Sequence, residues 1–132
     1  MATKVPCKLL IADDYANAAD ALAEMCSDHY DVRTAYSGRE ALRTVLDWRP
    51  RVAILDIDMP APNGLEIAAT IRVAPNLEPI ALIAVTGRTA QYDRAIAIKY
   101  GFDAFLSKPV DSRELLRLVA QYCDDDSQAP RR

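Results

Sequence analysis

Residues 51–64 read RVAILDIDMPAPNG. The first six form an apolar run with β-branched side chains, a composition and length typical of a buried strand, and the run ends in an aspartate. The prolines and glycine that follow favour a loop. Beyond the loop, Leu65, Ala68 and Ile71 recur at helical spacing, which predicts a helix to about residue 72. The stretch therefore predicts one unit of strand, loop and helix.

The same alternation extends over most of the chain. Other strands are expected at residues 8–12, 31–36, 80–86 and 102–107. Other helices are expected at residues 15–27, from Ser37 until Pro50, at 91–100 and at 111–122, with a polar tail or linker at 123–132. In the first helix, Ala18, Leu22 and Met25 share the face that is expected to point inward.

Five strand–helix units in succession favour a parallel sheet that is covered on both faces. Right-handed crossovers leave few layouts for such a chain. We therefore expect an α/β, flavodoxin-like (βα)5 doubly wound sheet with strand order 2-1-3-4-5, formed by residues 1–122.

Composition narrows the class of protein. The chain has 132 residues, enough for one domain, and its net charge of −3 argues against direct nucleic acid binding. No apolar run approaches the roughly 20 residues that span a membrane. Cys7, Cys26 and Cys123 lack metal-ligand spacing and are expected to be free thiols, which indicates a reducing cytoplasm.

Acidic residues follow two of the inner strands. Asp13 and Asp14 end the first strand and Asp56 ends the third. In the expected strand order these strands are neighbours, and ligands bind at their carboxyl ends, where the winding direction reverses. A cluster of carboxylate oxygens without histidine or cysteine favours Mg²⁺ over zinc.

Two further strand ends complete the predicted site. Thr86 ends the fourth strand and Lys108 follows the fifth. A hydroxyl donor and an ammonium beside a carboxylate–metal cluster suit a phosphoryl group, and Asp56 can act as its nucleophile.

With these residues in place, the sequence resembles the receiver (CheY-like) domain of two-component response regulators. The resemblance runs from residue 8 to residue 122. The matching motifs are KLLIADD at 8–14, YSGREAL at 36–42, VAILDIDMPAPNGLE at 52–66, VTG at 85–87 and YGFDAFLSKPV at 100–110.

The resemblance implies a role for each site residue. Asp56 would be the phosphoacceptor, and Lys108 would pair with the phosphate. Asp14, Asp56 and the main-chain carbonyl of Asp58 would bind Mg²⁺ directly, with Asp13 helping through water.

The resemblance also implies a conformational switch. Thr86 and Phe105 match the switch hydroxyl and the switch aromatic, and Pro109 would follow a cis peptide bond. Asp58 and Arg88 match positions that tune phosphate lifetime, and they either pair across the site or remain solvated.

The implied partner is a sensor histidine kinase or a histidine phosphotransfer protein. The implied output face, a possible homodimer contact, comprises the helix at 91–100, the strand at 102–107 and the helix at 111–122. Such a domain assists its own phosphorylation and dephosphorylation but is not an enzyme.

Two alternatives remain open from the sequence. One is an aspartate-nucleophile phosphatase of the haloacid dehalogenase type, which also starts from a D-x-D strand end. The other is a pseudo-receiver that only binds. The sequence also leaves open whether the domain acts alone or belongs to a larger protein such as a hybrid kinase.

Overall fold

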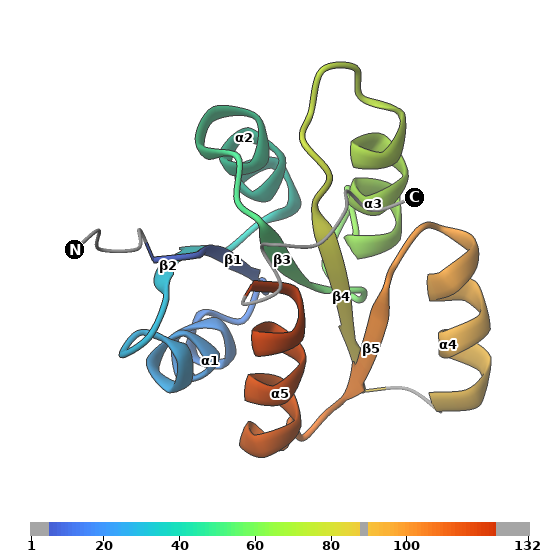
Figure 1. Ribbon diagram of the computed structural model, residues 1–132. Coiled ribbons are helices and arrows are strands. Elements are labelled where there is room, and N and C mark those ends of the chain that lie inside the picture. The colour runs from blue at the N-terminus through green and yellow to red at the C-terminus, as the bar shows by residue number, and fades with distance from the viewer. Residues whose placement is uncertain (1–5, 88–89, 124–132) are drawn as a thin grey trace.

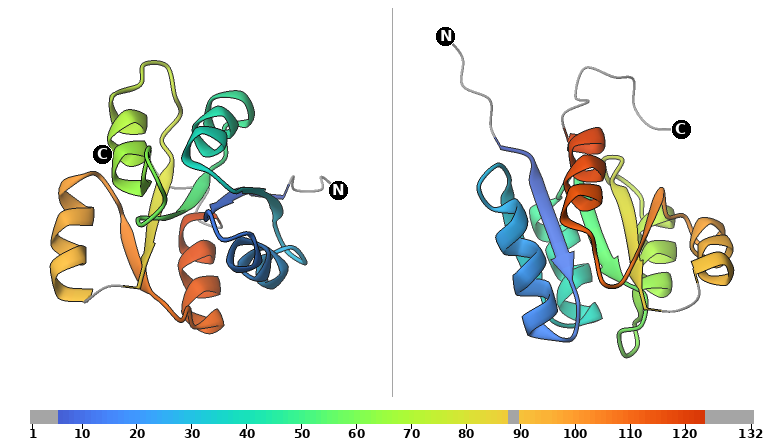
Figure 2. Two further views of the ribbon diagram at one scale, coloured as in Figure 1. Left: turned by 180° about the vertical axis from the view of Figure 1, so that it is seen from behind. Right: turned by 90° about the horizontal axis from the view of Figure 1, so that it is seen from below.

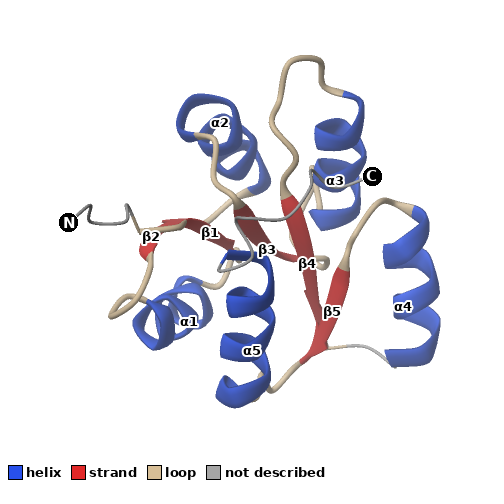
Figure 3. Cartoon of the chain, in the orientation of Figure 1, coloured by secondary structure: helices blue, strands red, loops and turns tan. Residues whose placement is uncertain are grey.

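The computed structural model describes residues 6–87 and 90–123, in which strands and helices alternate along the chain (Figures 1 and 3). The strands are β1 (Lys8–Ala12), β2 (Asp31–Ala35), β3 (Val52–Asp56), β4 (Ala81–Thr86) and β5 (Ala104–Ser107). The helices are α1 (Ala16–Cys26), α2 (Gly38–Trp48), α3 (Gly64–Val73), α4 (Ala90–Lys99) and α5 (Ser112–Cys123). Within the described residues, no helix is long and apolar enough to cross a bilayer.

The five strands form one parallel sheet in the order β2-β1-β3-β4-β5. Helices α1 and α5 cover one face, and α2, α3 and α4 cover the other (Figures 1 and 2). This arrangement confirms the flavodoxin-like prediction, including the reversal of winding between β1 and β3.

Alternate residues of each strand supply two separate hydrophobic cores. In β1, Leu9 and Ile11 pack with α1 and α5, whereas Leu10 and Ala12 pack with α2 and α3. Side chains of a strand point to opposite faces in turn, so a strand buried on both faces is apolar throughout. This explains why the β1, β3 and β4 segments read as continuous apolar runs.

Helix ends follow the predicted signals. The Ser37 hydroxyl accepts a hydrogen bond from the Glu40 N–H at 3.1 Å, which caps α2. Gly101 lies just beyond α4 with a φ of 106°, a conformation that glycine adopts without steric cost.

The expected inward face of α1 is confirmed at Leu22 and wrong at Ala18 and Met25. Ala19, Leu22 and Cys26 are buried, whereas Met25 is 37% exposed and Ala18 is only partly buried. Both sets of residues are apolar and both have helical spacing, so the sequence pattern alone did not fix the rotation of the helix.

The expectation of three free thiols is wrong for two of them. Cys7, just before β1, and Cys123, the last residue of α5, form a disulfide with a Cα–Cα distance of 5.7 Å. Cys26 is free and buried, and burial raises the pKa of its thiol to about 11. The cytoplasmic prediction therefore loses the support that it drew from free cysteines.

Candidate functional site

The candidate site lies at the carboxyl edge of the sheet, where the inner strands end. Asp56 is the last residue of β3 and Thr86 the last of β4, while Asp13 and Asp14 follow β1. The register pairs Ala12 with Leu55, which sets Asp13 beside Asp56. Parallel strands in register thus gather side chains that lie far apart in sequence.

Three carboxylates meet at this edge. Asp13, Asp14 and Asp56 each offer one oxygen, and these oxygens lie within 4.8 Å of one another. Asp13 and Asp56 are only 3% exposed, whereas Asp14 is open to solvent. All-oxygen donors with one solvent-facing side, which leaves room for bound water, fit Mg²⁺.

The electrostatics of Asp56 also fit a cation. Burial, with a further contribution from the charge of Asp13, raises the pKa of Asp56 from 3.8 to about 6. The Asp58 N–H partly offsets this by donating to Asp56 Oδ1 at 3.0 Å. An ionised Asp56 therefore carries an unfavourable energy that a bound divalent cation would relieve.

Lys108 directly follows β5, and its side chain extends to the same carboxylates. Its Nζ lies 3.2 Å from Asp13 Oδ2 and 3.4 Å from Asp56 Oδ2. Burial disfavours the ammonium, but the charges of Asp56 and Asp13 outweigh burial, so the pKa of Lys108 is raised. The peptide bond between Lys108 and Pro109 is cis, as the resemblance implied.

Thr86 is completely buried, and its hydroxyl donates to Asp58 Oδ2 at 3.2 Å. The Asp58 carboxylate is therefore in contact with the last residue of β4. The predicted partner of Asp58, Arg88, lies outside the described residues.

Phe105 lies in β5 and is 8% exposed, so it is buried as expected for an aromatic residue of the last strand. It pairs in register with Ala84, two residues before Thr86. Residues two apart in a strand share a face, so Phe105 and Thr86 lie on the same side of the sheet.

The comparisons with known proteins agree with this geometry. A family model described as the response regulator receiver domain matches residues 9–120. The chain belongs to the response regulator receiver family.

Individual relatives support the receiver assignment. The chain is 36% identical over 93% of its length to an uncharacterized 14.6 kDa protein in the sodA1 3' region of Leptolyngbya boryana, and covers 95% of that protein. It is 34% identical over 85% of its length to the response regulator ArlR of Staphylococcus aureus, and spans only about half (50%) of ArlR.

Solved receiver structures are similar in fold. A putative response regulator from Chloroflexus aurantiacus J-10-fl gives a TM-score of 0.85 at 26% identity, over 91% of this chain and 99% of that one. A CheY-like receiver domain protein from Methanospirillum hungatei JF-1 gives 0.80 at 25% identity, over 93% and 98%. The receiver family and fold decide against the haloacid dehalogenase alternative.

Two features of the receiver site escaped the sequence interpretation. A second cis peptide bond joins Ala61 to Pro62 in the loop after β3, and no residue pattern distinguishes it from a trans bond. Arg94 of α4 places its guanidinium carbon 5.3 Å from the centroid of the Phe105 ring. An exposed arginine on a helix gives no sign in the sequence that it faces a particular aromatic residue.

Proposed function

We propose that this receiver domain accepts a phosphoryl group on Asp56 from a phosphohistidine of a sensor histidine kinase or a histidine phosphotransfer protein. The observation that supports the proposal most is the combination of the Asp13–Asp14–Asp56 oxygens within 4.8 Å and Lys108 Nζ within 3.4 Å of Asp56. A nucleophile, a metal-binding set and a cation for phosphoryl oxygens occur together there.

In the proposed transfer, an Asp56 carboxylate oxygen forms a bond to phosphorus as the bond between phosphorus and the histidine nitrogen breaks. The imidazole leaves with that electron pair. Asp14, Asp56 and the Asp58 carbonyl would hold Mg²⁺, with Asp13 acting through water, and the ion supplies positive charge to the phosphoryl oxygens when bound. Lys108 is near enough to pair with one phosphoryl oxygen once its contacts to the two carboxylates loosen.

Phosphorylation replaces the single negative charge of the Asp56 carboxylate with a phosphoryl group that carries nearly two, beside a buried hydroxyl. We propose that Thr86 then exchanges Asp58 for a phosphoryl oxygen and that this exchange favours the buried position of the Phe105 ring. The surface of α4, β5 and α5 would carry this change to a partner or to a second copy of the chain.

Intact-mass measurement after incubation with acetyl phosphate and Mg²⁺ tests the proposal. Wild type should gain one labile phosphoryl group, and Asp56→Asn should gain none. An adduct that persists in Asp56→Asn would place the chemistry on another residue. No adduct on folded wild type would favour the pseudo-receiver, a module that only binds.

A further inference from the structure

Arg94 and Phe105 form a contact between α4 and β5 on the output face. The guanidinium carbon lies 5.3 Å from the ring centroid, within the range of a cation–π interaction. Arg94 is exposed, whereas the ring is 8% exposed. The cation therefore covers the solvent side of an otherwise buried ring.

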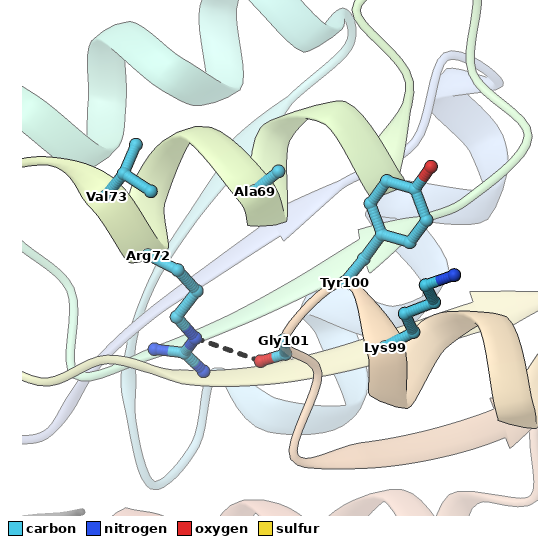
Figure 4. A pocket seen from close by; sticks show the side chains of 6 residues that line it. All are labelled: Ala69, Arg72, Val73, Lys99, Tyr100 and Gly101. Atoms are coloured by element: carbon cyan, nitrogen blue, oxygen red, sulfur yellow. Dashed lines mark hydrogen bonds between the residues drawn. The ribbon is translucent and has the colours of Figure 1, made fainter.

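The carboxyl end of α4 is held by a different set of contacts. Arg72 of α3 donates to Gly101 O at 2.9 Å, just past α4, and to Ile80 O at 2.8 Å. It also pairs with Asp103 at 2.9 Å. Figure 4 shows Arg72 reaching Gly101 across a groove between α3 and the end of α4, lined also by Ala69, Val73, Lys99 and Tyr100.

The middle of α4 and its carboxyl end thus make different kinds of contact. The Arg72 guanidinium donates to Gly101 O, to Ile80 O and to Asp103 Oδ2, and so links the Gly101 end to the segments that precede β4 and β5. Arg94, in the middle of α4, contributes a cation–π contact to a side chain in β5. A contact of this kind changes whenever the ring moves.

We propose that Arg94 is a positioning residue that holds the Phe105 ring in its buried position and thereby couples α4 to β5. This inference rests on the proposed function, in which phosphorylation at Asp56 favours the same ring position. A cation–π contact at an exposed site corresponds to roughly a two- to five-fold change in an equilibrium. Removal of the charge should shift the ring toward its outward position by that factor.

Fluorine NMR of protein labelled with 4-fluorophenylalanine provides the test. The chain has two phenylalanines, Phe102 and Phe105, so two resonances are expected, and Phe105→Leu assigns them. Arg94→Gln should move the Phe105 resonance toward that of an exposed ring, and Arg94→Lys should restore part of the wild-type position. Arg43→Gln, the same change on the exposed surface of α2, should leave both resonances in place.

Phosphorylation with acetyl phosphate and Mg²⁺ separates this inference from the proposed function. In Arg94→Gln it should return the Phe105 resonance part of the way to the wild-type position. If wild type gains a phosphoryl group but Arg94→Gln leaves the Phe105 resonance unchanged, the positioning role is refuted. If wild type gains none, the proposed function fails, while the spectra without phosphodonor still decide whether Arg94 holds the ring. The Phe102 resonance reports whether each variant is folded.

Discussion

Replacement of Asp56 with asparagine should stabilise the metal-free protein at neutral pH. The carboxyl group is 3% exposed, and burial together with the charge of Asp13 raises its pKa from 3.8 to about 6. At pH 7 the folded protein must hold this group ionised in a place that disfavours the charge. An amide of the same shape removes the charge and can still accept the hydrogen bond from the Asp58 N–H.

The pH dependence follows from the direction of the shift. The folded state binds the Asp56 proton more tightly than the unfolded state. The stability contributed by the protonated carboxyl group is therefore fully present below pH 3.8. It is lost as the pH rises through about 6 and stays lost above that value. The difference in unfolding free energy between Asp56→Asn and wild type should therefore grow as the pH rises from 3.8 to about 6.

The expected magnitude is moderate. A pKa difference of about two corresponds to ~3 kcal/mol. This difference already includes the attraction of Lys108, whose charge lowers the pKa of Asp56, so no separate loss of that ion pair is subtracted. We expect a gain of ~3 kcal/mol in the free energy of unfolding at pH 7.5.

Urea unfolding of both proteins in EDTA, at pH 4 and at pH 7.5, measures this difference. Added Mg²⁺ should stabilise wild type more than the variant, because the ion offsets the charge that the variant lacks. If Asp56→Asn is less stable than wild type at pH 7.5 without metal, Lys108 compensates the buried carboxylate in full. In that case the proposed electrostatic cost does not exist.

Three further predictions concern separate parts of the structure. Cys123→Ser should lower the free energy of unfolding by ~2–4 kcal/mol in oxidising buffer, because the disulfide spans 116 residues, and the loss should disappear when wild type is reduced. Gly64→Ala should lower the thermal midpoint at a cost of ~1–3 kcal/mol, since its Cβ would lie 2.6 Å from the main-chain oxygen that ends β3. Gly87→Ala, with nothing within 4 Å of its Cβ, is the control, and equal midpoints would contradict this account. Asp14→Asn should weaken Mg²⁺ binding in calorimetry more than Asp58→Asn does, and the reverse order would mean that the Asp58 carboxylate is the ligand.

The strand order and the residues at the strand ends could be predicted because both depend on local pattern and general topology. Continuous apolar runs identified strands buried on two faces, and each run stopped at a polar residue such as Asp56 or Thr86. Topology then required these ends to meet. Their proximity in the structure follows from the strand order, while their roles in phosphoryl transfer remain predictions.

Contacts between side chains on different elements could not be predicted in the same way. The buried face of α1 differs from the prediction at Ala18 and Met25, although the helix itself was expected. Cys7 and Cys123 are separated by almost the whole chain, and their spacing carries no information about pairing. The approach of Arg94 to Phe105 likewise depends on how α4 packs against β5.

The two edges of the sheet contribute to stability in opposite directions. At the carboxyl edge, Asp56 is buried close to Asp13, and despite the Lys108 ammonium its ionised form costs free energy in the absence of a divalent cation. At the amino edge, the disulfide joins the start of β1 to the end of α5, and Arg51 donates to Tyr122 O at 3.1 Å. Because those contacts lie away from the acidic cluster, they can offset its cost without altering its geometry. A receiver of this construction can therefore keep a charged, reactive edge while its fold is held together from the opposite side.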